Sequence, residues 1–556
     1  MLKTLARSSL KLRWLVYIVW LAFVLRGLFY CSAFPIFEGF DEYVHFGVIQ
    51  RVFFHHEIAN PRAADYSREI AESLKLVPVP WLLRDDAMGR LSHEAYWRLA
   101  PSDRLDRQMR LRTLPPSWAS ADAQPSWQLY EAQQPPLFHW IILPVYASVK
   151  SFDLPTRVWV LRCASLLLAS TIIPIAFATA KRFFFDQRGA LGVAIVVASM
   201  PQLAVDAFRI SNEDLSIPMG GLAIFAVLTL WKSPPNLPRG ILVGLVLSAA
   251  LLTKAYFLAL LPWAAFVLIG VLLRDPQHRR TAAWQMVAVL TTCLAASGWF
   301  YWRALSLTGT VTGEMNDVAA QTSRLSITGA IRIMPWRRIL DFVAGTHIWL
   351  GNWSFLVVRT WMYRAIELVF VLAMSGLVLH FVRPRKSLPE RTSLCVLIMP
   401  YVFLLLGALF QAVQGFRSAG NIGTMGYYLF ALIVPEAIVL LAGLFRLLPD
   451  IYSLFFVPVL ALFFNLLEQF GTTFLLLPYY AGIIQHDGSG HLPALKISQL
   501  AHGGISRLFD NLLANKPAFL TSWELMFMMA LSFGAAVALV SIGCLVAVRS
   551  RNRPAV

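Results

Sequence analysis

Charged residues are scarce in this chain, and acidic residues are the scarcest of them. The 556 residues include 31 Asp and Glu against 48 Lys and Arg, and charged residues make up only 14% of the total. Because a soluble domain carries about 25% charged residues, this composition excludes an ordinary soluble protein.

Cysteine is also rare, and its placement excludes several kinds of site. The five cysteines lie in or at the edge of apolar segments, without a CxxC pair or a Cys/His ligand spacing: Cys31, Cys163, Cys293, Cys395 and Cys544. We therefore expect no disulfide framework, no zinc site, no haem and no iron–sulfur cluster.

Apolar residues, by contrast, are abundant. Hydrophobic residues make up 57% of the chain and aromatic residues 13%, and the mean hydropathy is +0.60. Apolar segments of roughly 16 to 25 residues recur along the whole length, which matches helices that cross a hydrocarbon layer roughly 30 Å thick and not the strands of a barrel. The sequence predicts an all-α polytopic membrane protein.

The net charge of +17 raises the question of a nucleic-acid partner. The basic residues fall in short clusters between apolar runs, which is the pattern of cytoplasmic loops in membrane proteins, so we expect no nucleic acid. The first apolar segment, residues 14–34, has the flanks of a secretory signal, but Arg26 interrupts it and no small-x-small cleavage site follows. We expect this segment to be the first span, with the amino terminus in the cytoplasm.

Placing the basic clusters inside divides the chain into about twelve spans with both ends in the cytoplasm. Residues 1–34 form the tail and first span, and 35–156 a large first extracytoplasmic loop. Residues 157–302 form a transmembrane bundle, 303–365 a second outer loop, and 366–556 the C-terminal spans with an outer loop at 478–522. The apolar stretch at 137–150 is short for a span and predicts an interfacial helix within the first loop.

The first outer loop opens with the stretch "FDEYVHF", residues 40–46. Helical spacing would place Asp41 and His45 four apart on one face, and Glu38 lies three residues before Asp41 across Gly39. Either these groups converge on a reacting site, or Asp41 and Glu42 simply occupy the first turn of a surface helix, where carboxylates are favoured. The residues alone leave both interpretations open.

Three further polar stretches fall on the same predicted face. "YEAQQPPLFHW", residues 130–140, carries Gln133 and Gln134 before two prolines, which also mark an ordinary helix start. "SNED", residues 211–214, brings Asp214 to an outer membrane boundary, where either a polar turn or a functional group is expected. "LLTKAYF", residues 251–257, holds Lys254, which is either a snorkelling lysine or a cation aimed at an anionic headgroup.

A glycine-rich stretch at residues 415–435 supplies Arg417 on this face. It lacks the spacing of a nucleotide-binding fingerprint, so we expect no nucleotide donor.

In their order along the chain, these residues resemble the GT-C membrane glycosyltransferases, the class that includes protein O-mannosyltransferases, lipid A aminoarabinose transferases and bacterial arabinosyltransferases. In that class a first outer loop opens with an Asp-Glu pair, here Asp41-Glu42, and ends near a His-x-Pro-Pro-Leu stretch, here residues 133–137. A further Asp after a Ser/Asn-rich turn matches Asp214, and a Thr-Lys pair matches Lys254. Glutamine replaces the usual histidine before the prolines, and Tyr427 stands where relatives often carry arginine.

The resemblance implies an enzyme of the inner (plasma) membrane that transfers a sugar from a polyprenyl-phosphate donor to a glycan, lipid or protein acceptor. The transfer would take place at the extracytoplasmic face, with inversion and without a nucleotide sugar. Asp41 would be the general base that takes the acceptor proton. The donor phosphate or headgroup would be bound by a larger set: Glu42, Lys254, Arg417, Gln133 and Gln134. A divalent cation, Mg²⁺ or Mn²⁺, would find oxygen and nitrogen ligands in Glu42, Asp214 and His45.

Two alternatives remain open at this stage. A transporter or flippase of lipid-linked sugars would place ionisable residues near the midplane of several spans, where Arg26 and Asp206 are the candidates. A scaffold within an envelope complex would leave Asp41 dispensable.

Overall fold

The computed structural model describes residues 2–60, 65–116, 118, 129–274, 276–501 and 503–551. These residues form helices and connecting loops without a strand, apart from two isolated bridges, Val79 with Ser92 and Asp85 with Arg90. The all-α prediction is confirmed.

Ten helical segments of the described chain are long and apolar enough to span a membrane, which confirms the polytopic prediction. They are Trp14–Ala33 within α1 (Leu2–Ala33), Leu154–Phe183 (α7 and α8), Glu213–Lys232 (α11), Ala255–Arg274 (η4 and α13), Pro276–Thr308 (η5 and α14), Thr360–Val382 (α18), Arg391–Ala419 (α19), Gly426–Leu447 (η6 and α20), Asp450–Tyr480 (α21 to α23) and Ser522–Val548 within α25 (Ser522–Arg551).

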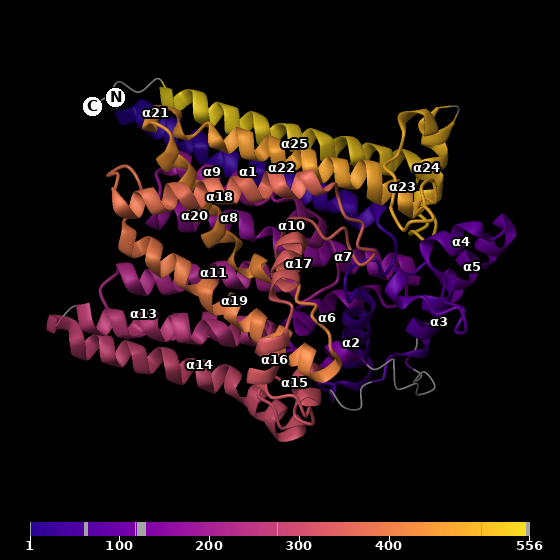
Figure 1. The fold of residues 1–556 in the computed structure, drawn as a ribbon, viewed down its shortest axis with the longest axis horizontal. Coiled ribbons are helices and arrows are strands. Elements are labelled where there is room, and N and C mark those ends of the chain that lie inside the picture. Colours follow the sequence, from indigo (N-terminus) through magenta and orange to yellow (C-terminus); the bar gives the residue numbers. More distant parts are fainter. Residues whose placement is uncertain are drawn as a thin grey trace.

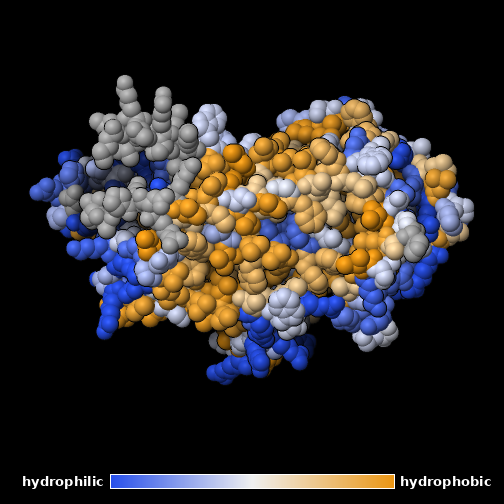
Figure 2. Space-filling model, turned by 90° about the horizontal axis from the view of Figure 1, so that it is seen from above, coloured by the Kyte–Doolittle hydropathy of each residue, from blue (hydrophilic) through white to orange (hydrophobic). Residues whose placement is uncertain are grey.

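The long helices run side by side, and the described ends of the chain lie together at one end of the bundle (Figure 1). Figure 2 shows an apolar band across the middle of one face, with hydrophilic side chains gathered mainly toward both ends of the long axis. This distribution is expected of a bundle whose middle faces hydrocarbon.

The count of twelve spans stays a prediction, because two predicted spans correspond to shorter helices. Residues 190–208 fold as α9 (Gln187–Ser199) and α10 (Pro201–Asp206), and residues 241–253 belong to α12 (Leu237–Thr253). At about 1.5 Å per residue, the 13 residues of α9 and the 17 of α12 fall short of a full hydrocarbon layer. Both helices nevertheless pack inside the bundle, α9 against α1 and α8 and α12 against α11 and α14.

The predicted outer loops contain short helices. Several of them lie at the end of the molecule away from the termini, and those of the second loop lie near its middle (Figure 1). The first loop holds α2 (Glu42–His55), α3 (Arg68–Leu76), α4 (His93–Arg98), α5 (Pro101–Thr113), η3 (Tyr130–Gln133) and α6 (Leu137–Val149). The second holds α15 (Met315–Ala320), α16 (Ile327–Ile333) and α17 (Trp336–Ile348), and the third holds α24 (Gly504–Leu512). The 13-residue helix α6, predicted to be interfacial, packs against α2 and α7.

Arg26, which interrupts the first span, is fully buried in the bundle. Its guanidinium donates hydrogen bonds to both carboxylate oxygens of Glu468 and to the carbonyl of Ala198, and the Tyr30 hydroxyl donates to the same carboxylate. The charge is therefore matched within the protein, as a buried charge must be, and it ties α1 to α9 and α22 (Phe456–Gly471).

Candidate active site

Asp41 immediately precedes α2 and has a backbone conformation that residues other than glycine rarely adopt. Its φ is +59°, in the left-handed region, and its carboxylate makes no capping bond to α2. An Asp that only opened a helix would cap the first turn, so this geometry favours the interpretation in which Asp41 is held for another purpose. Gly39 allows the same turn to approach Arg209, since a β-carbon at Gly39 would lie 2.6 Å from that of Arg209.

The half-buried carboxylate of Asp41 accepts a hydrogen bond from the hydroxyl of Tyr130, on η3. Burial raises the pKa of Asp41, and the Tyr130 hydroxyl and the positive charges of Lys254 and Arg209 oppose that rise. The three residues thus come from distant parts of the chain and act on one carboxylate.

Both carboxylate oxygens of Glu42 are bound within the protein, and its predicted role in holding a headgroup or a metal ion stays a prediction. Its two carboxylate oxygens each accept a hydrogen bond of 2.6 Å from the guanidinium of Arg162, and one also accepts from the backbone N–H of Ile210 at 3.2 Å. Arg162 also donates to the carbonyls of Phe34 and Pro35. Glu42 therefore fixes the entry of the outer loop to α7 (Leu154–Ser170).

His45 points to a second histidine instead of a metal site. Its Nδ1 lies 3.3 Å from Nε2 of His139, the two rings stack, and its Nε2 lies 3.8 Å from a carboxylate oxygen of Glu131. Burial and the neighbouring His139 lower the pKa of His45 well below its usual range. Within the part of the chain that the structure describes, no three His, Cys, Asp or Glu side chains gather as a metal-ligand set, so the trio of Glu42, Asp214 and His45 does not form.

Lys254 lies where α12 ends, and its ammonium is directed at an acidic partner that the sequence analysis did not assign. It forms an ion pair with Glu213, the first residue of α11. The hydroxyl of Tyr256 donates to the other Glu213 oxygen at 3.0 Å, and the Lys254 nitrogen lies 4.9 Å from the ring centre of Tyr428. The lysine is buried, not snorkelling.

Arg209 is a cation of this site that the sequence analysis missed. It is 2% exposed, lies 4.5 Å from the ring centre of Tyr427, and faces Asp206 at 3.7 Å. Its Nε has no hydrogen-bond partner among the described residues. Both carboxylate oxygens of the buried Asp214 likewise lack partners there. Position 427 is a tyrosine where the class that the sequence resembles often has an arginine. Arg209 therefore supplies the positive charge beside it.

Gln133 and Gln134 hold a carboxylate that comes from the second outer loop. Their amide nitrogens donate to the two oxygens of Glu314, at 2.8 and 2.9 Å. Burial raises the pKa of Glu314 to about 7, against the opposing charge of Lys254. The side-chain nitrogen of Asn212 lies 3.5 Å from the oxygen of Gln134, which connects this wall of the site to the start of α11.

The hydrogen bonds of Arg417 go to residues outside this group, and its predicted phosphate role stays a prediction. Its guanidinium donates to the carbonyl of Leu325 at 2.8 Å, to the side chain of Gln414 at 2.6 Å and to the carbonyl of Ala320 at 3.1 Å. These bonds fasten the end of α19 to the second outer loop, so the side chain is engaged structurally.

The structure therefore brings together Asp41, Lys254, Gln133 and Gln134 from the predicted set, and adds four unassigned residues: Tyr130, Glu131, Arg209 and Glu314. Tyr130 and Glu131 belong to the stretch that was singled out for Gln133 and Gln134, and Arg209 lies two residues before the stretch 211–214. The signal that could have identified these three residues is their position next to predicted site residues. Glu314 stands in a loop without any motif, and nothing in the sequence pointed to it.

No protein-family model matches the chain, and no curated protein matches it. Two solved structures of ArnT from Cupriavidus metallidurans are similar to it. The one bound to undecaprenyl phosphate has 13% identity and a TM-score of 0.47, over 96% of this chain and 77% of that chain. The apo structure has 12% identity and a TM-score of 0.42, over 95% and 77%. Both structures are distant from this chain in sequence and in backbone geometry.

Proposed function

We propose that this chain is a membrane glycosyltransferase that moves a sugar from a polyprenyl-phosphate donor to an acceptor hydroxyl at the extracytoplasmic face of the inner (plasma) membrane. The observation that carries the proposal is the position of Asp41. A carboxylate without a capping bond is held by Tyr130 within the electrostatic reach of Lys254 and Arg209, at the end of a membrane bundle.

Asp41 is the general base of the proposed reaction. An acceptor hydroxyl is a weak nucleophile, and a carboxylate within hydrogen-bond reach takes its proton as the attack develops. The new bond forms between the acceptor oxygen and the anomeric carbon, while the bond from that carbon to the phosphate oxygen breaks on the opposite face. The configuration at the anomeric carbon is thereby inverted, and the electron pair of the broken carbon–oxygen bond leaves with the polyprenyl phosphate.

Arg209 and Lys254 stabilise the departing phosphate. A phosphate leaving group needs positive charge rather than an acid, because it is already a weak base. Arg209 has, in this proposal, the phosphate-binding role that was predicted for Arg417. The Nε of Arg209 lacks a hydrogen-bond partner among the described residues. The Lys254 ammonium is paired with Glu213, which fixes its direction.

In this proposal the hydroxyl groups of the sugar donate hydrogen bonds to buried acceptor oxygens of the site. Among the described residues, Gln133 Oε1, Glu131 Oε2 and Asn212 Oδ1 are buried without a hydrogen-bond donor. Buried acceptors require donors, and sugar hydroxyls present several on one small ring. These three residues flank Glu314 and Gln134, beside the base and the cations.

No step of the proposed reaction is routed through a metal ion. The expected ligands Glu42 and His45 are engaged by Arg162 and His139, and Asp214 keeps two unpartnered oxygens that face the charge of Arg209. The residues present therefore do not match the predicted divalent-cation site.

No observation favours the transporter alternative, since both of its candidate residues have oppositely charged neighbours within the protein. Arg26 is bound to Glu468, and Asp206 accepts from Gln202 at 2.8 Å and faces Arg209.

Purified enzyme with a radiolabelled polyprenyl-phosphate sugar and an extract of envelope acceptors tests the proposal. Time-dependent transfer of label to acceptor, with release of polyprenyl phosphate, is expected. Movement of intact donor across vesicles without transfer would instead establish a flippase. The side of the membrane on which the site lies is tested by labelling introduced cysteines with a thiol reagent that does not cross the membrane. Cysteines at the exposed positions Ser102 and Ala419 should react from outside, whereas a cysteine at the exposed position Ser387 should not. The exposed Cys395 and Cys544 are first replaced by serine.

A further inference from the structure

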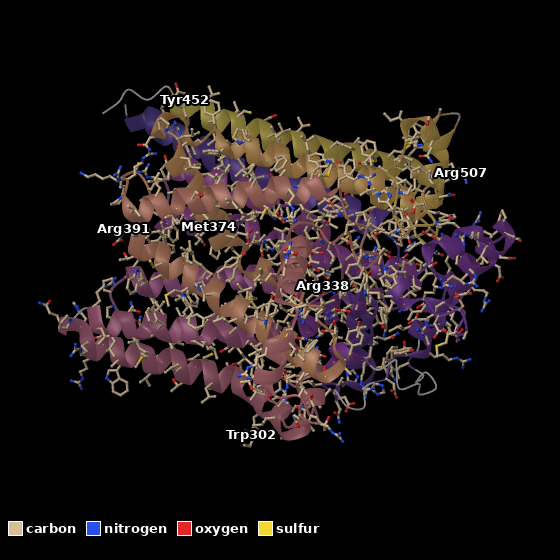
Figure 3. All side chains as sticks on the ribbon, viewed as in Figure 1. Trp302, Arg338, Met374, Arg391, Tyr452 and Arg507 are labelled. Carbon is tan, nitrogen blue, oxygen red and sulfur yellow. The ribbon has the colours of Figure 1, made fainter. Side chains whose placement is uncertain are left out.

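A cavity of about 540 Å³ lies between α17, α18, α19 and α20 (Ile433–Leu447), apart from the residues around Asp41. Its walls are almost entirely apolar and include Phe370, Leu377, Leu397, Leu405 and Val439. The volume falls within the range of about 300 to 1,000 Å³ that is common for small-molecule sites. We call this feature the α18–α19 groove. Figure 3 labels Met374, one of its lining residues on α18.

The α18–α19 groove is bordered by side chains that face the bilayer. Met374 and Val402 line it from the two sides and are 50% and 52% exposed. Both α18 and α19 are candidate spans with most of their surface outside the protein core. An apolar cavity between candidate spans offers water few hydrogen-bonding partners, so a hydrocarbon chain is the occupant that fits it.

Three polar side chains in the wall of the α18–α19 groove bond to one another, and a fourth, Glu367, accepts a hydrogen bond from Arg364. His347 Nδ1 donates to the carbonyl of Gly426 at 3.1 Å, and its Nε2 lies 2.9 Å from the carboxylate of Glu436. The hydroxyl of Tyr401 donates to the other Glu436 oxygen at 2.7 Å. These bonds join α17, η6 (Gly426–Leu432), α19 and α20 around one end of the groove, and they leave its surface apolar.

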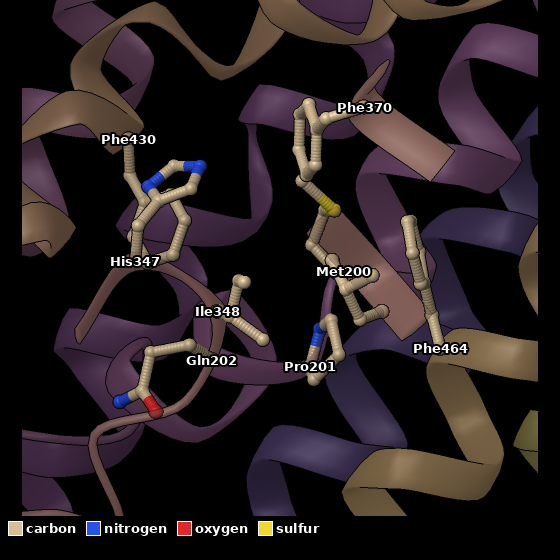
Figure 4. A pocket seen from close by; sticks show the side chains of 9 residues that line it. Met200, Pro201, Gln202, His347, Ile348, Phe370, Phe430 and Phe464 are labelled. Carbon is tan, nitrogen blue, oxygen red and sulfur yellow. The ribbon is translucent and has the colours of Figure 1, made fainter. Parts of the chain in front are cut away.

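A line of contacts leads from that end to the proposed headgroup site. A small inner cavity shares His347, Ile348 and Phe370 with the groove and adds Gln202 to its lining (Figure 4). The Gln202 amide donates to Asp206 at 2.8 Å, and Asp206 faces Arg209.

The backbone of η6 also leads from His347 toward the proposed headgroup site. Gly426, bonded to His347, is followed by Tyr427 and Tyr428, whose rings lie beneath Arg209 and Lys254. Contacts through His347 and η6 thus connect one end of the groove to the two cations assigned to the donor phosphate.

We propose that the α18–α19 groove binds the isoprenoid chain of the donor while Arg209 and Lys254 hold its phosphate. This inference rests on the proposed function. An ordinary membrane acyl chain would also fill an apolar groove, but the contacts at its inner end lead to cations that match a phosphate at the head of the chain. The chain enters sideways between α18 and α19.

Tryptophan substitutions that fill the groove test this inference. Met374→Trp and Val402→Trp place a large ring in the groove, and Val378→Trp and Leu406→Trp are matched controls on the same helices. The control positions are 59% and 57% exposed and do not line the groove. Thermal unfolding of all four variants verifies that they fold alike.

The steady-state assay compares a long-chain polyprenyl-phosphate sugar with a geranyl-phosphate sugar. The groove variants should raise KM for the long-chain donor about tenfold, the equivalent of 1.4 kcal/mol, and leave KM for the geranyl donor unchanged. The controls should change neither value. Equal KM for the long-chain donor in groove variants and controls would overturn the inference.

A binding measurement separates failure of the groove from failure of the proposed function. Long-chain polyprenyl phosphate with a photoreactive group in its chain, and no sugar, should label residues 360–382 and 391–419 in the native enzyme. Labelling should be lost in the two groove variants and kept in the controls. Labelling without any transfer activity would uphold the groove and refute the transferase. Labelling that phospholipid displaces as well as unlabelled polyprenyl phosphate does would show an ordinary lipid site and refute the groove.

Discussion

The hydroxyl of Tyr130 donates a hydrogen bond to the carboxylate of Asp41 across a separation of 89 residues. The bond joins the last part of the first outer loop to its beginning. It holds Asp41 at the start of α2 in a position where its side chain caps nothing. The proposed base is therefore oriented by a residue that lies beside Glu131 and the two glutamines.

Replacing Tyr130 with phenylalanine should alter the pH dependence of transfer. Burial raises the pKa of Asp41 and the Tyr130 bond lowers it, so its loss raises the pKa further. Because the base works when ionised, the acid limb of the kcat/KM profile should move to higher pH, and kcat/KM at neutral pH should fall about tenfold, as expected for a bond worth about 1.4 kcal/mol. The exposed Tyr17→Phe is the control. Superimposable profiles would contradict the assignment.

Arg209 and Arg417 should respond differently to replacement by glutamine. Arg209→Gln removes a cation from the leaving phosphate, and kcat/KM should fall about 10²- to 10³-fold, the usual effect of losing one such stabilising group. Arg417→Gln loses bonds to Leu325 and Ala320, so its unfolding temperature should fall while kcat/KM of the folded enzyme stays near wild type. The opposite pattern would restore the phosphate role to Arg417.

The buried pair of Glu42 and Arg162 is expected to govern folding. Glu42→Gln leaves the Arg162 guanidinium buried without a counter-charge, which typically costs about 3–5 kcal/mol. Glu57→Gln breaks an exposed pair with Arg51, whose N–O distance is 3.2 Å, and should cost about 1 kcal/mol or less. Chemical unfolding in detergent measures both. If Glu42→Gln unfolded like wild type but lost transfer, Glu42 would belong to the active site after all.

Glu314 should make stability depend on pH. Burial raises its pKa from 4.5 to about 7, so the folded state binds a proton that the unfolded state has already lost. The stability contributed by this group is present below pH 4.5 and declines as pH rises toward 7, by about 1–3 kcal/mol in total. Glu314→Gln should remove that decline. Parallel stability curves for the two proteins between pH 4.5 and 8 would show that the carboxyl titrates normally.

The all-α polytopic architecture could be predicted from the sequence, because the length of apolar segments reflects the thickness of a membrane. The same reasoning placed Asp41, Gln133, Gln134 and Lys254 on one face, where the structure brings them together. Local patterns sufficed for this, since each residue stands at the boundary between an apolar run and a loop.

The remaining residues depend on tertiary contacts that no local pattern encodes. Glu42 and Asp41 are adjacent in sequence, but the left-handed turn at Asp41 sends their carboxylates to different partners. Arg162 lies inside an apolar span with no signal that it pairs with Glu42. Glu314 reaches the glutamines only because the second outer loop folds back over the first.

The most direct test of the account is the rate of sugar transfer by Asp41→Asn, measured beside Asp103→Asn, a change of an exposed aspartate in the same outer loop. Asparagine keeps the shape of the side chain but cannot take a proton, so transfer should fall by about 10²- to 10⁴-fold, with unfolding temperature and polyprenyl-phosphate binding retained. Asp103→Asn should match wild type. Near-normal transfer by Asp41→Asn would contradict the account, because the proton of the acceptor would then be removed by another group.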